Sequence, residues 1–443
     1  MTLQADASRG SRADYWAFVF LAATVLSAPI GNNIRVLGHP SIFPFRVFLV
    51  AFLAAAAVRY FMLGCPRPSL SLRDVGAPWV GITAWGLLSL VWAQDLGAGI
   101  RYVGFLFQGT VLILGLRVYG RRRDRLAILL SVAAIGLVVA IACALFERAT
   151  LYRFPASHMR DPLVAWQHYY LFTGLFHNPN DFATYLALWL PLVLQAYLEW
   201  PKLSVRAAAL GLCGLCGFLL ITMFSRANTI AAVLAGLVIF AFSARRRWRQ
   251  WAILLAAMPV LFFALPGRQK EFFVRSLGRV SQGLTAKAAQ DDPRARLARE
   301  SLALLERSHG LGVGAGNVEP RMAALHAQRA YAGTRLVNLH NWWLEILVGL
   351  GVAGFALYLM FYLRLLRGLL TGYCQLRSAD AGLAALCLGL FAAFAGLTIG
   401  CLSSSSLVFQ SPMWVFFGLG AAAVGAAEER GRPRPPEAGE EAL

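Results

Sequence analysis

The chain has 443 residues, of which 58% are hydrophobic and 14% are charged, whereas about 25% of residues are charged in soluble domains. Its net charge of +19 arises mainly from Lys and Arg in short segments between apolar runs, so a nucleic-acid-binding protein is disfavoured. We expect no cleavable signal segment, because no small-residue cleavage site follows the first apolar stretch. The seven cysteines lie in apolar runs or in predicted cytoplasmic connections, which predicts no disulfide framework.

Apolar runs recur along almost the whole chain, and a membrane-spanning helix needs about 20 such residues. The twelve runs fall at about 15–33, 42–64, 77–93, 98–118, 126–146, 182–199, 206–224, 227–243, 250–266, 342–364, 381–402 and 407–427. The pattern predicts an all-α polytopic membrane protein with about 12 transmembrane helices.

Connections rich in Lys and Arg alternate with connections that lack them, and short basic connections stay in the cytoplasm. Both termini are then predicted to be cytoplasmic. The basic connections are Arg9 to Arg12, Arg67 to Arg73, Arg117 to Arg125, Lys202 to Arg206, Arg245 to Arg249, Arg364 to Arg377 and the tail from Arg430.

The same pattern divides the chain into four parts. Residues 1–266 are predicted to hold transmembrane helices 1–9, and residues 267–341 to form one large loop on the opposite side of the membrane from the termini. Residues 342–428 would hold helices 10–12. Residues 429–443 are rich in proline and charge, which is typical of a disordered tail.

The large loop carries twelve Lys and Arg against six Asp and Glu. An anionic substrate would explain basic residues on that side. Within it, Asp291-Asp292-Pro293 predicts a helix start, and the helix should end near Arg307. At about 100° per residue, an apolar arc faces the membrane domain, with Arg294 on the same side and a charged arc opposite. The apolar arc comprises Ala298, Ser301, Leu302, Leu304 and Leu305, and the charged arc comprises Arg296, Arg299, Glu300, Glu306 and Arg307.

His340 precedes a Trp pair and an apolar run, in the order Asn338-Leu-His-Asn341-Trp-Trp. Trp favours the membrane–water boundary, so His340 should lie just outside the entry of a helix into the bilayer. A neutral imidazole there can accept a proton near neutral pH. The alternative is an interfacial histidine that is hydrogen-bonded to Asn338 or Asn341.

Two arginines are candidate phosphate ligands, because the guanidinium fork matches phosphate oxygens. Arg226 lies in a short turn between two apolar runs, and Arg294 lies on the docking side of the loop helix. A snorkelling side chain is the alternative for Arg226. It is also the favoured interpretation of Arg46 and Arg101, which lie near the ends of apolar runs.

Three further motifs have structural interpretations. Around Asn178-Pro179-Asn180 we expect a proline turn and a helix cap, with hydrogen bonds to a sugar or acceptor as the alternative. The glycine-rich 312–317 stretch matches no nucleotide fingerprint and is predicted to be a turn. Gly349, Gly351 and Gly354 are expected to allow close helix packing. We find no His/Asp/Glu cluster with metal-ligand spacing, and we predict metal-independent chemistry without a cofactor.

Four of these motifs, in this order, resemble the O-antigen ligase family of the O-antigen ligase/polymerase superfamily. They are G-L-F-H-N-P-N-D-F-A-T-Y-L-A-L-W-L-P-L at 174–192, S-R-A-N-T at 225–229, R-A-R-L-A-R-E-S-L-A-L-L-E-R-S-H-G-L-G-V-G-A-G-N at 294–317, and L-H-N-W-W-L-E-I-L-V-G-L-G-V-A-G at 339–354. The part of the chain before these motifs matches only in hydropathy. Ala298 stands where an aromatic residue is frequent, and Leu171 near where many relatives carry an arginine.

The resemblance implies a GT-C-like, metal-independent, inverting glycosyltransferase of the bacterial inner membrane. It would transfer a glycan from undecaprenyl diphosphate to the lipid A-core oligosaccharide on the periplasmic face. By match, His340 is the essential histidine, and Arg226 and Arg294 hold the diphosphate. Supporting roles would fall to Asn341, Asn338, Asn178, Asn180 and Arg101.

Other functions remain open at this stage. The superfamily also contains O-antigen polymerases and protein O-oligosaccharyltransferases, which motif spacing separates poorly. A lipid or polysaccharide transporter would predict paired charges inside the spans and internal repeats, which the sequence lacks. A lipid-binding scaffold is the remaining alternative.

Overall fold

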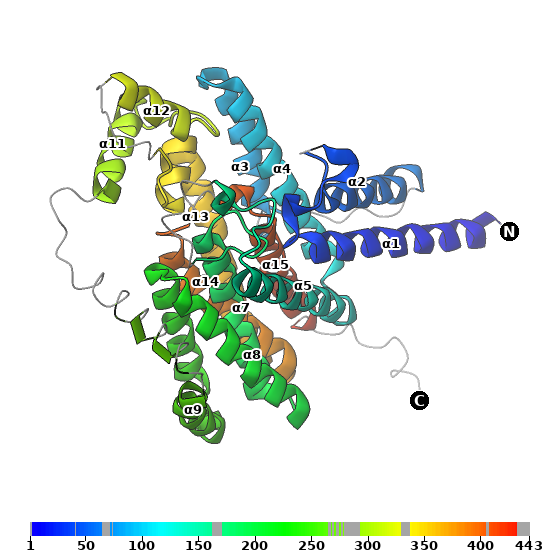
Figure 1. The fold of residues 1–443 in the computed structure, drawn as a ribbon. Coiled ribbons are helices and arrows are strands. Elements are labelled where there is room, and N and C mark those ends of the chain that lie inside the picture. The colour runs from blue at the N-terminus through cyan, green and yellow to red at the C-terminus, as the bar shows by residue number, and fades with distance from the viewer. Residues whose placement is uncertain are drawn as a thin grey trace.

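The computed structural model describes residues 2–39, 41–63, 71–72, 74–161, 171–264, 293–328, 337–404 and 407–431, with isolated positions between 267 and 278. The described elements are helical (Figure 1). In chain order they are α1 (Thr2–Ser27), η1 (Gly31–Asn33), η2 (Val36–Gly38), α2 (Pro44–Ala57), η3 (Val58–Met62), α3 (Ala77–Leu88), η4 (Ser89–Trp92), α4 (Leu96–Tyr119), α5 (Arg123–Thr150), η5 (His158–Arg160), α7 (Pro179–Glu199), α8 (Leu203–Thr222), α9 (Arg226–Ala264), α11 (Pro293–Arg307), α12 (Val318–Gln328), α13 (Trp342–Leu376), α14 (Ala381–Gly400), η6 (Leu407–Phe409) and α15 (Ser411–Arg430).

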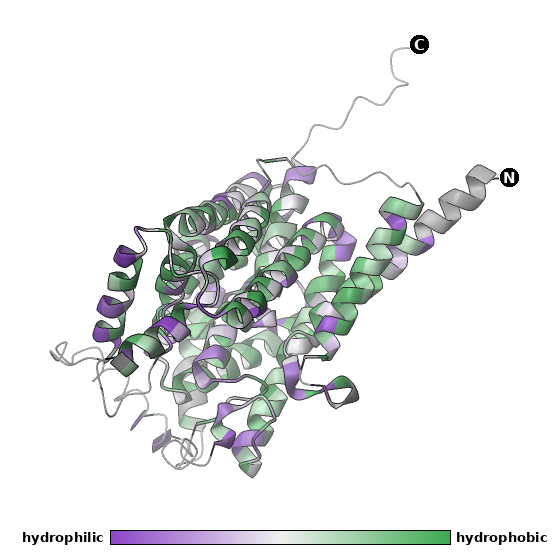
Figure 2. Ribbon diagram, turned by 90° about the horizontal axis from the view of Figure 1, so that it is seen from above, coloured by the Kyte–Doolittle hydropathy of each residue, from purple (hydrophilic) through white to green (hydrophobic). Residues whose placement is uncertain are grey.

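The apolar runs of the sequence all lie on helices, which confirms an all-α polytopic membrane protein. Eight helical segments of the described chain are long and apolar enough to cross a membrane, and Ala77–Trp92 is a shorter apolar helix. Hydrophobic residues dominate the bundle, while hydrophilic residues gather on α11 and on the connections (Figure 2). The eight are 44–62, 96–119, 123–150, 179–199, 203–222, 226–257, 342–376 and 381–400.

Helix α9 contains two of the predicted runs, and a kink at Arg247 separates them. The ring centroid of Trp251 lies 5.1 Å from that of Phe240, although eleven residues of straight helix would span about 16 Å. The indole nitrogen of Trp251 also donates to Ser243 Oγ at 3.0 Å. The two halves therefore fold toward one another, and the predicted break at Arg245 to Arg249 is a kink rather than a loop.

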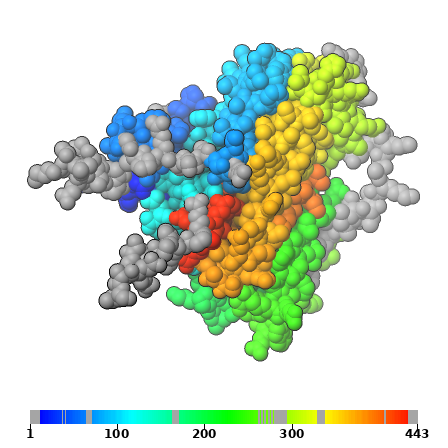
Figure 3. All heavy atoms as spheres, turned by 180° about the vertical axis from the view of Figure 1, so that it is seen from behind, coloured from blue at the N-terminus to red at the C-terminus, as the bar shows by residue number. Residues whose placement is uncertain are grey.

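The predicted connection from Arg364 to Arg377 is helical, because α13 continues through it to Leu376. Leu365 and Leu369 are fully buried in this extension, one helical turn apart. Gly368 lets α13 approach Val424 of α15 closely. Burial of this apolar face against α15 stabilises the helix despite its flanking arginines. Figure 3 shows α13 crossing one face of the molecule beside α3.

Connections that share a predicted side of the membrane lie together at one end of the bundle. The Arg117 guanidinium is within 3.1 Å of Asp74 and 2.6 Å of Glu428, and Arg123 is 3.0 Å from Asp380. These contacts join the third basic connection to residues that adjoin the second, the sixth and the tail. The positive-inside rule makes this end the cytoplasmic one, which stays a prediction.

The glycine-rich stretch after α11 packs backbone to backbone on a break in α13. Val313 N–H donates to Val348 O at 2.8 Å, and Val352 N–H donates to Gly310 O at 2.9 Å. Gly351 has φ +69°, and a Cβ there would lie 2.3 Å from Leu311 O. Only glycine tolerates both the backbone angle and the close approach. The stretch is thus a turn, and it anchors α11 and α12 to α13.

Candidate active site

Three helix N-termini meet at one cavity of about 370 Å³, which we call the polar cavity. Asn178 to Asn180 begin α7, Arg226 begins α9, and Arg294 lies at the start of α11. Each N-terminus carries partial positive charge, because its first N–H groups have no carbonyl partner within the helix. The arrangement favours an anion. The lining residues are His158, Met159, Leu171, Asn178, Pro179, Asn180, Met223, Phe224, Ser225, Arg226, Ala227, Arg294 and Ser403.

A buried asparagine holds the turn that carries Arg226. Asn228 is fully buried, and its amide donates to Ser225 Oγ at 2.9 Å and to Ser403 Oγ at 3.3 Å. Its side-chain oxygen accepts from Thr184 of α7 at 3.1 Å. These bonds join three segments that are far apart in sequence, so Arg226 is placed by the whole junction rather than by its own turn.

Helix α11 begins at Pro293 and ends at Arg307, as the cap residues and spacing predict. Its buried face differs from the predicted arc: Glu300 is 8% exposed and Leu302 is 44% exposed. Leu297, Ser301 and Leu304 are buried. The buried face is rotated relative to the predicted arc because α11 packs on α12 as well as on α13. Glu300 contacts His326 of α12 at 2.9 Å.

Arg294 lies at the edge of this buried face and is exposed toward the polar cavity. It shares the cavity wall with Arg226, although 67 residues separate the two in sequence (294 − 226 − 1). The predicted convergence of the two guanidinium groups on one space is therefore present in the structure, while their role as diphosphate ligands stays a prediction.

His340 lies immediately before α13 with an unusual φ of +47°. Asn338 shapes this turn, because its side-chain oxygen accepts from His340 N–H at 2.8 Å and its amide donates to Glu319 at 2.7 Å. The ring nitrogen Nδ1 of His340 is buried, and no described residue hydrogen-bonds to it. The alternative interpretation was a bond from the imidazole to Asn338 or Asn341, but Asn338 binds the backbone N–H of His340 instead.

The pKa of the His340 imidazole is lowered from its usual 6.5, first because burial disfavours the charged ring. The positive charge of Arg294, and then that of His158, lowers the pKa further. His340 is not among the residues that line the polar cavity, but the charges of Arg294 and His158, which do line it, act on its ring. A ring with a lowered pKa is neutral at neutral pH, which is the form able to accept a proton.

The two residues of the Trp pair differ in burial and in their contacts. Trp342 is 1% exposed and packs edge-on against Tyr358 in the core. Trp343 is partly buried, and its indole nitrogen donates to Thr398 O at 3.0 Å. These side chains fix the start of α13 against the protein, where α14 packs beside it.

The supporting residues fall into two groups. Asn178 caps α7 by accepting from Asn180 N–H at 2.8 Å, and Asn341 caps α13 by accepting from Trp343 and Leu344 N–H at 3.1 and 3.3 Å. Asn178 and Asn180 line the polar cavity. Arg101 lines two other cavities together with Asn338, so the structure does not place it beside Arg226.

The loop before α7 brings in a residue that the motifs did not indicate. His158 lines the polar cavity, and its Nδ1 and its backbone N–H approach His177 O at 2.5 and 3.0 Å. The two imidazole rings lie 5.2 Å apart. The sequence offered one indication of His158: histidine is uncommon in this chain, and His158 lies in the same loop as the H-N-P-N-D stretch at 177–181.

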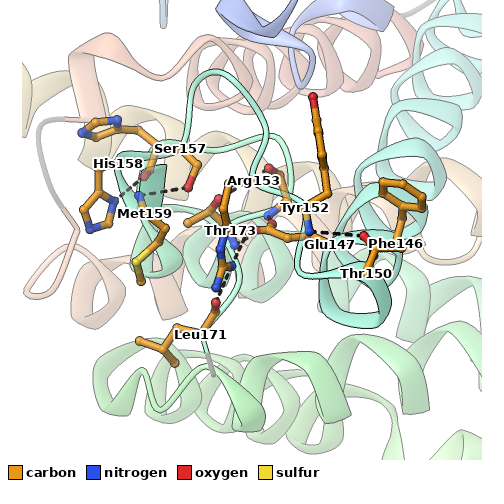
Figure 4. Close-up of polar contacts among 12 residues, drawn as sticks. Phe146, Glu147, Thr150, Tyr152, Arg153, Ser157, His158, Met159, Leu171 and Thr173 are labelled. Carbon is orange, nitrogen blue, oxygen red and sulfur yellow. Dashed lines mark hydrogen bonds and ion pairs between the residues drawn. The ribbon is translucent and has the colours of Figure 1, made fainter. Parts of the chain in front are cut away.

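Glu147 anchors this loop from the end of α5 (Figure 4). It is fully buried, binds Arg153 at 2.6 Å, and accepts the N–H groups of Thr173 and Gly174 at 2.9 and 2.5 Å. Arg153 in turn donates to Leu171 O at 2.6 Å. Leu171 is thus bound through its carbonyl by an arginine of the same loop.

Within the described residues, no three His, Cys, Asp or Glu side chains are grouped to hold a metal ion. Metal-independent chemistry stays a prediction, as does the identity of any bound lipid. The geometry supplies cationic groups and helix N-termini around one space, and the charge of Arg294 in its wall acts on the imidazole of His340.

Comparison with known proteins agrees with this geometry. Residues 211–359 match the family model described as O-antigen ligase, and this range contains Arg226, Arg294 and His340. The chain is also similar to the teichuronic acid biosynthesis protein TuaE of Bacillus subtilis (strain 168). The two are 26% identical over 425 residues, which cover 92% of this chain and 83% of that protein.

The fold defines a multi-pass membrane protein. Residues 211–359 match the model of the O-antigen ligase family, which confirms the resemblance predicted from the motifs. Together with the relative over most of the chain, the match supports a glycosyltransferase of the ligase or polymerase type that acts in polysaccharide biosynthesis.

Proposed function

We propose that the protein is an O-antigen ligase that transfers a glycan from undecaprenyl diphosphate to the lipid A-core oligosaccharide on the periplasmic face of the inner membrane. The observation that carries the proposal is the polar cavity, where three helix N-termini and two arginines surround one space, and where the charge of Arg294 acts on His340. A lipid-linked diphosphate is the anion that a membrane glycosyltransferase of this family would bind there.

The two arginines would act on the leaving group. As the bond between the sugar anomeric carbon and the diphosphate oxygen breaks, the bonding electrons move to the diphosphate. Arg226 and Arg294 stabilise this growing charge, together with the N-terminal N–H groups of α7 and α9. Arginine suits this role because its planar fork donates two parallel hydrogen bonds to phosphate oxygens.

His340 would act on the acceptor. Its neutral ring accepts the hydroxyl proton while the acceptor oxygen forms its bond to the anomeric carbon from the opposite face. The displacement occurs in a single step and inverts the configuration. A positioned general base contributes typically about 10²–10⁴ in rate, and burial together with Arg294 keeps this base unprotonated.

A polymerase is the second candidate, because the relative that covers 92% of this chain is named for teichuronic acid biosynthesis. In that reaction a second carrier-linked glycan supplies the hydroxyl. The donor chemistry at the polar cavity is the same for both reactions, so the acceptor separates them.

The test is an incubation of purified protein with carrier-linked glycan and one of three additions: lipid A-core, a protein acceptor, or nothing. Transfer only to lipid A-core supports the ligase. Longer carrier-linked glycan without an added acceptor supports the polymerase, and a glycosylated protein supports the protein ligase. No transfer in any arm, from protein that binds the donor, would refute glycosyltransfer.

A further inference from the structure

A second and larger cavity, of about 950 Å³, lies on the other side of the loop that carries His158 and His177. We call it the amphipathic cavity. His177 and Asn338 line its polar end, and these residues contact His158 and His340 respectively. The two cavities therefore flank the same pair of loops.

The other end of the amphipathic cavity is apolar. Leu49, Val50 and Leu53 of α2 face it, together with Ile100 and Phe107 of α4. Both helices are candidate membrane spans, and Val50, Ile100 and Phe107 are 64%, 56% and 51% exposed. Such a surface is in contact with lipid chains in a membrane, so an apolar chain can enter the cavity from the side.

Arg46 lies between the polar and the apolar ends. Its guanidinium stacks on the rings of Phe43 and Phe105 at 4.9 and 4.8 Å, and it donates to Gln108 at 3.2 Å and to Ser41 O at 3.0 Å. A snorkelling arginine extends freely toward water. This side chain is instead fixed by four neighbours, with its charge held at the cavity wall.

Arg101 adds a second cation to the same cavity. None of the ion pairs between described residues involves Arg46 or Arg101. Two carboxylates, Asp181 and Glu319, also line the cavity at its polar end, and Glu319 already accepts from Asn338. The two kinds of charge are thus separated in the cavity. The carboxylates lie at its polar end, and the two arginines, which form no ion pair with a described carboxylate, lie next to its apolar wall.

This order of groups matches an amphiphile with an anionic head. Leu53 lies seven residues beyond Arg46 on α2, which is about 10 Å further along the helix axis. An anion bound at Arg46 would leave its attached chain in contact with Leu49 and Leu53. A guanidinium that has no carboxylate partner in an apolar setting favours such an anion strongly.

We propose that the amphipathic cavity binds the acceptor, and that the acceptor is itself a lipid with a phosphate-bearing head. This inference rests on the proposed glycosyltransfer and names the substrate class of its second subsite. The head binds Arg46 and Arg101, and the chain lies along α2 and α4. The sugar end points past Asn338 and His177 toward His340. A soluble protein acceptor does not fit this cavity, whereas lipid A-core and a carrier-linked glycan both do.

The binding test uses a photoreactive long-chain alkyl phosphate and its neutral alcohol counterpart. With the full-length protein in detergent, we expect the phosphate probe to label peptides of α2 and α4. Arg46→Ala and Arg101→Ala should each reduce this labelling about tenfold, which is the usual scale for losing one charge-assisted hydrogen bond. Leu53→Trp should reduce it by filling the chain path.

Arg35→Ala is the matched control, because Arg35 is an exposed arginine just before α2 that lines neither cavity. Its labelling should equal that of the unmodified protein. Equal labelling by the neutral alcohol, or labelling that Arg46→Ala and Arg101→Ala leave unchanged, would overturn the anionic-lipid site.

The acceptor role is tested separately by competition and kinetics. The acceptor should displace the probe, and Arg46→Ala should raise the acceptor KM about tenfold while leaving the donor KM unchanged. Displacement by glycan-free undecaprenyl diphosphate but not by the acceptor would assign the cavity to the donor and overturn the proposal. If the unmodified protein transfers no glycan but is still labelled by the phosphate probe, the proposed glycosyltransfer is refuted. The cavity would then be a lipid-binding site without an acceptor role.

Discussion

The two cavities differ in how they present positive charge. The polar cavity combines Arg226 and Arg294 with the N-termini of three helices, and its walls come from loops and helix starts. The amphipathic cavity presents Arg46 on two aromatic rings, beside apolar faces of α2 and α4. The first arrangement suits a compact, highly charged group, and the second suits a charged head with an apolar chain.

The comparison also shows what the cavities share. His158 lines the polar cavity and His177 the amphipathic cavity, and both belong to the loop that Glu147 anchors. His340 is coupled to Arg294 on one side and bound by Asn338 on the other. Two substrates that bind in separate cavities would meet at this common wall.

The largest expected effect concerns the common wall. We expect His340→Asn to lower kcat by about 10²–10⁴, because it removes the general base, while donor and acceptor binding persist. Asparagine tolerates the positive φ at this position. The matched control is His309→Asn, since His309 is an exposed histidine with a similar φ of +50°. Comparable losses in both variants would show a backbone effect and remove His340 from the chemistry.

Breaking the anchor of the shared loop should impair both cavities at once. Glu147→Gln leaves Arg153 without its carboxylate, and removal of one partner of a buried ion pair typically costs about 3–5 kcal/mol. We expect a lower Tm and faster hydrogen exchange in residues 171–177, with weaker binding of both substrates. Glu306→Gln, on the exposed face of α11, should change neither. A defect limited to one substrate would contradict the shared wall.

The arginines of the polar cavity should affect the donor alone. Arg226→Ala and Arg294→Ala are each expected to weaken donor binding about tenfold, through loss of a charge-assisted hydrogen bond, and to leave the acceptor KM unchanged. Arg299→Ala serves as the control, because Arg299 is exposed on α11 and lines neither cavity. Titration with a donor analogue measures the affinity of each variant. Equal losses of affinity in Arg294→Ala and Arg299→Ala would contradict a specific role of Arg294 in donor binding.

The smallest expected effect is on the pH profile. Because activity needs neutral His340, kcat/KM should fall as the pH drops through the pKa of this ring, and the lowered pKa places that acid limb below 6.5. Arg294→Gln removes a positive neighbour, which raises the pKa and moves the limb upward. Arg299→Gln should leave it in place. A limb that stays fixed in Arg294→Gln would contradict the coupling between the base and the polar cavity.

Much of the helical framework and three site residues follow from sequence pattern. Hydropathy located the helices, because a segment that crosses a bilayer must satisfy its own backbone hydrogen bonds. The residues Asp291-Asp292-Pro293 marked the start of α11, and Asn178 is the cap that its residue type suggests. Asp291 and Asp292 themselves lie outside the described residues, as do residues 432–443 of the predicted tail.

Other features could not be found this way. Periodicity placed Glu300 on the exposed arc of α11, but a second helix packs there and supplies His326. His158 gave no motif signal, since its position depends on Glu147 binding backbone N–H groups 26 and 27 residues away. The extension of α13 to Leu376 depends on its contact with α15, which the local run of arginines conceals.

The amino-acid sequence by itself determined that the protein is a helical bundle in a membrane, and it singled out His340, Arg226 and Arg294. Local chemistry suffices for these, because hydropathy, caps and residue type act over a few residues. Only the tertiary structure decided that Arg226 and Arg294 share a cavity, that Arg46 and Arg101 line a second one, and that one loop separates the two. Such placement depends on contacts between helices distant in sequence, which no local pattern encodes.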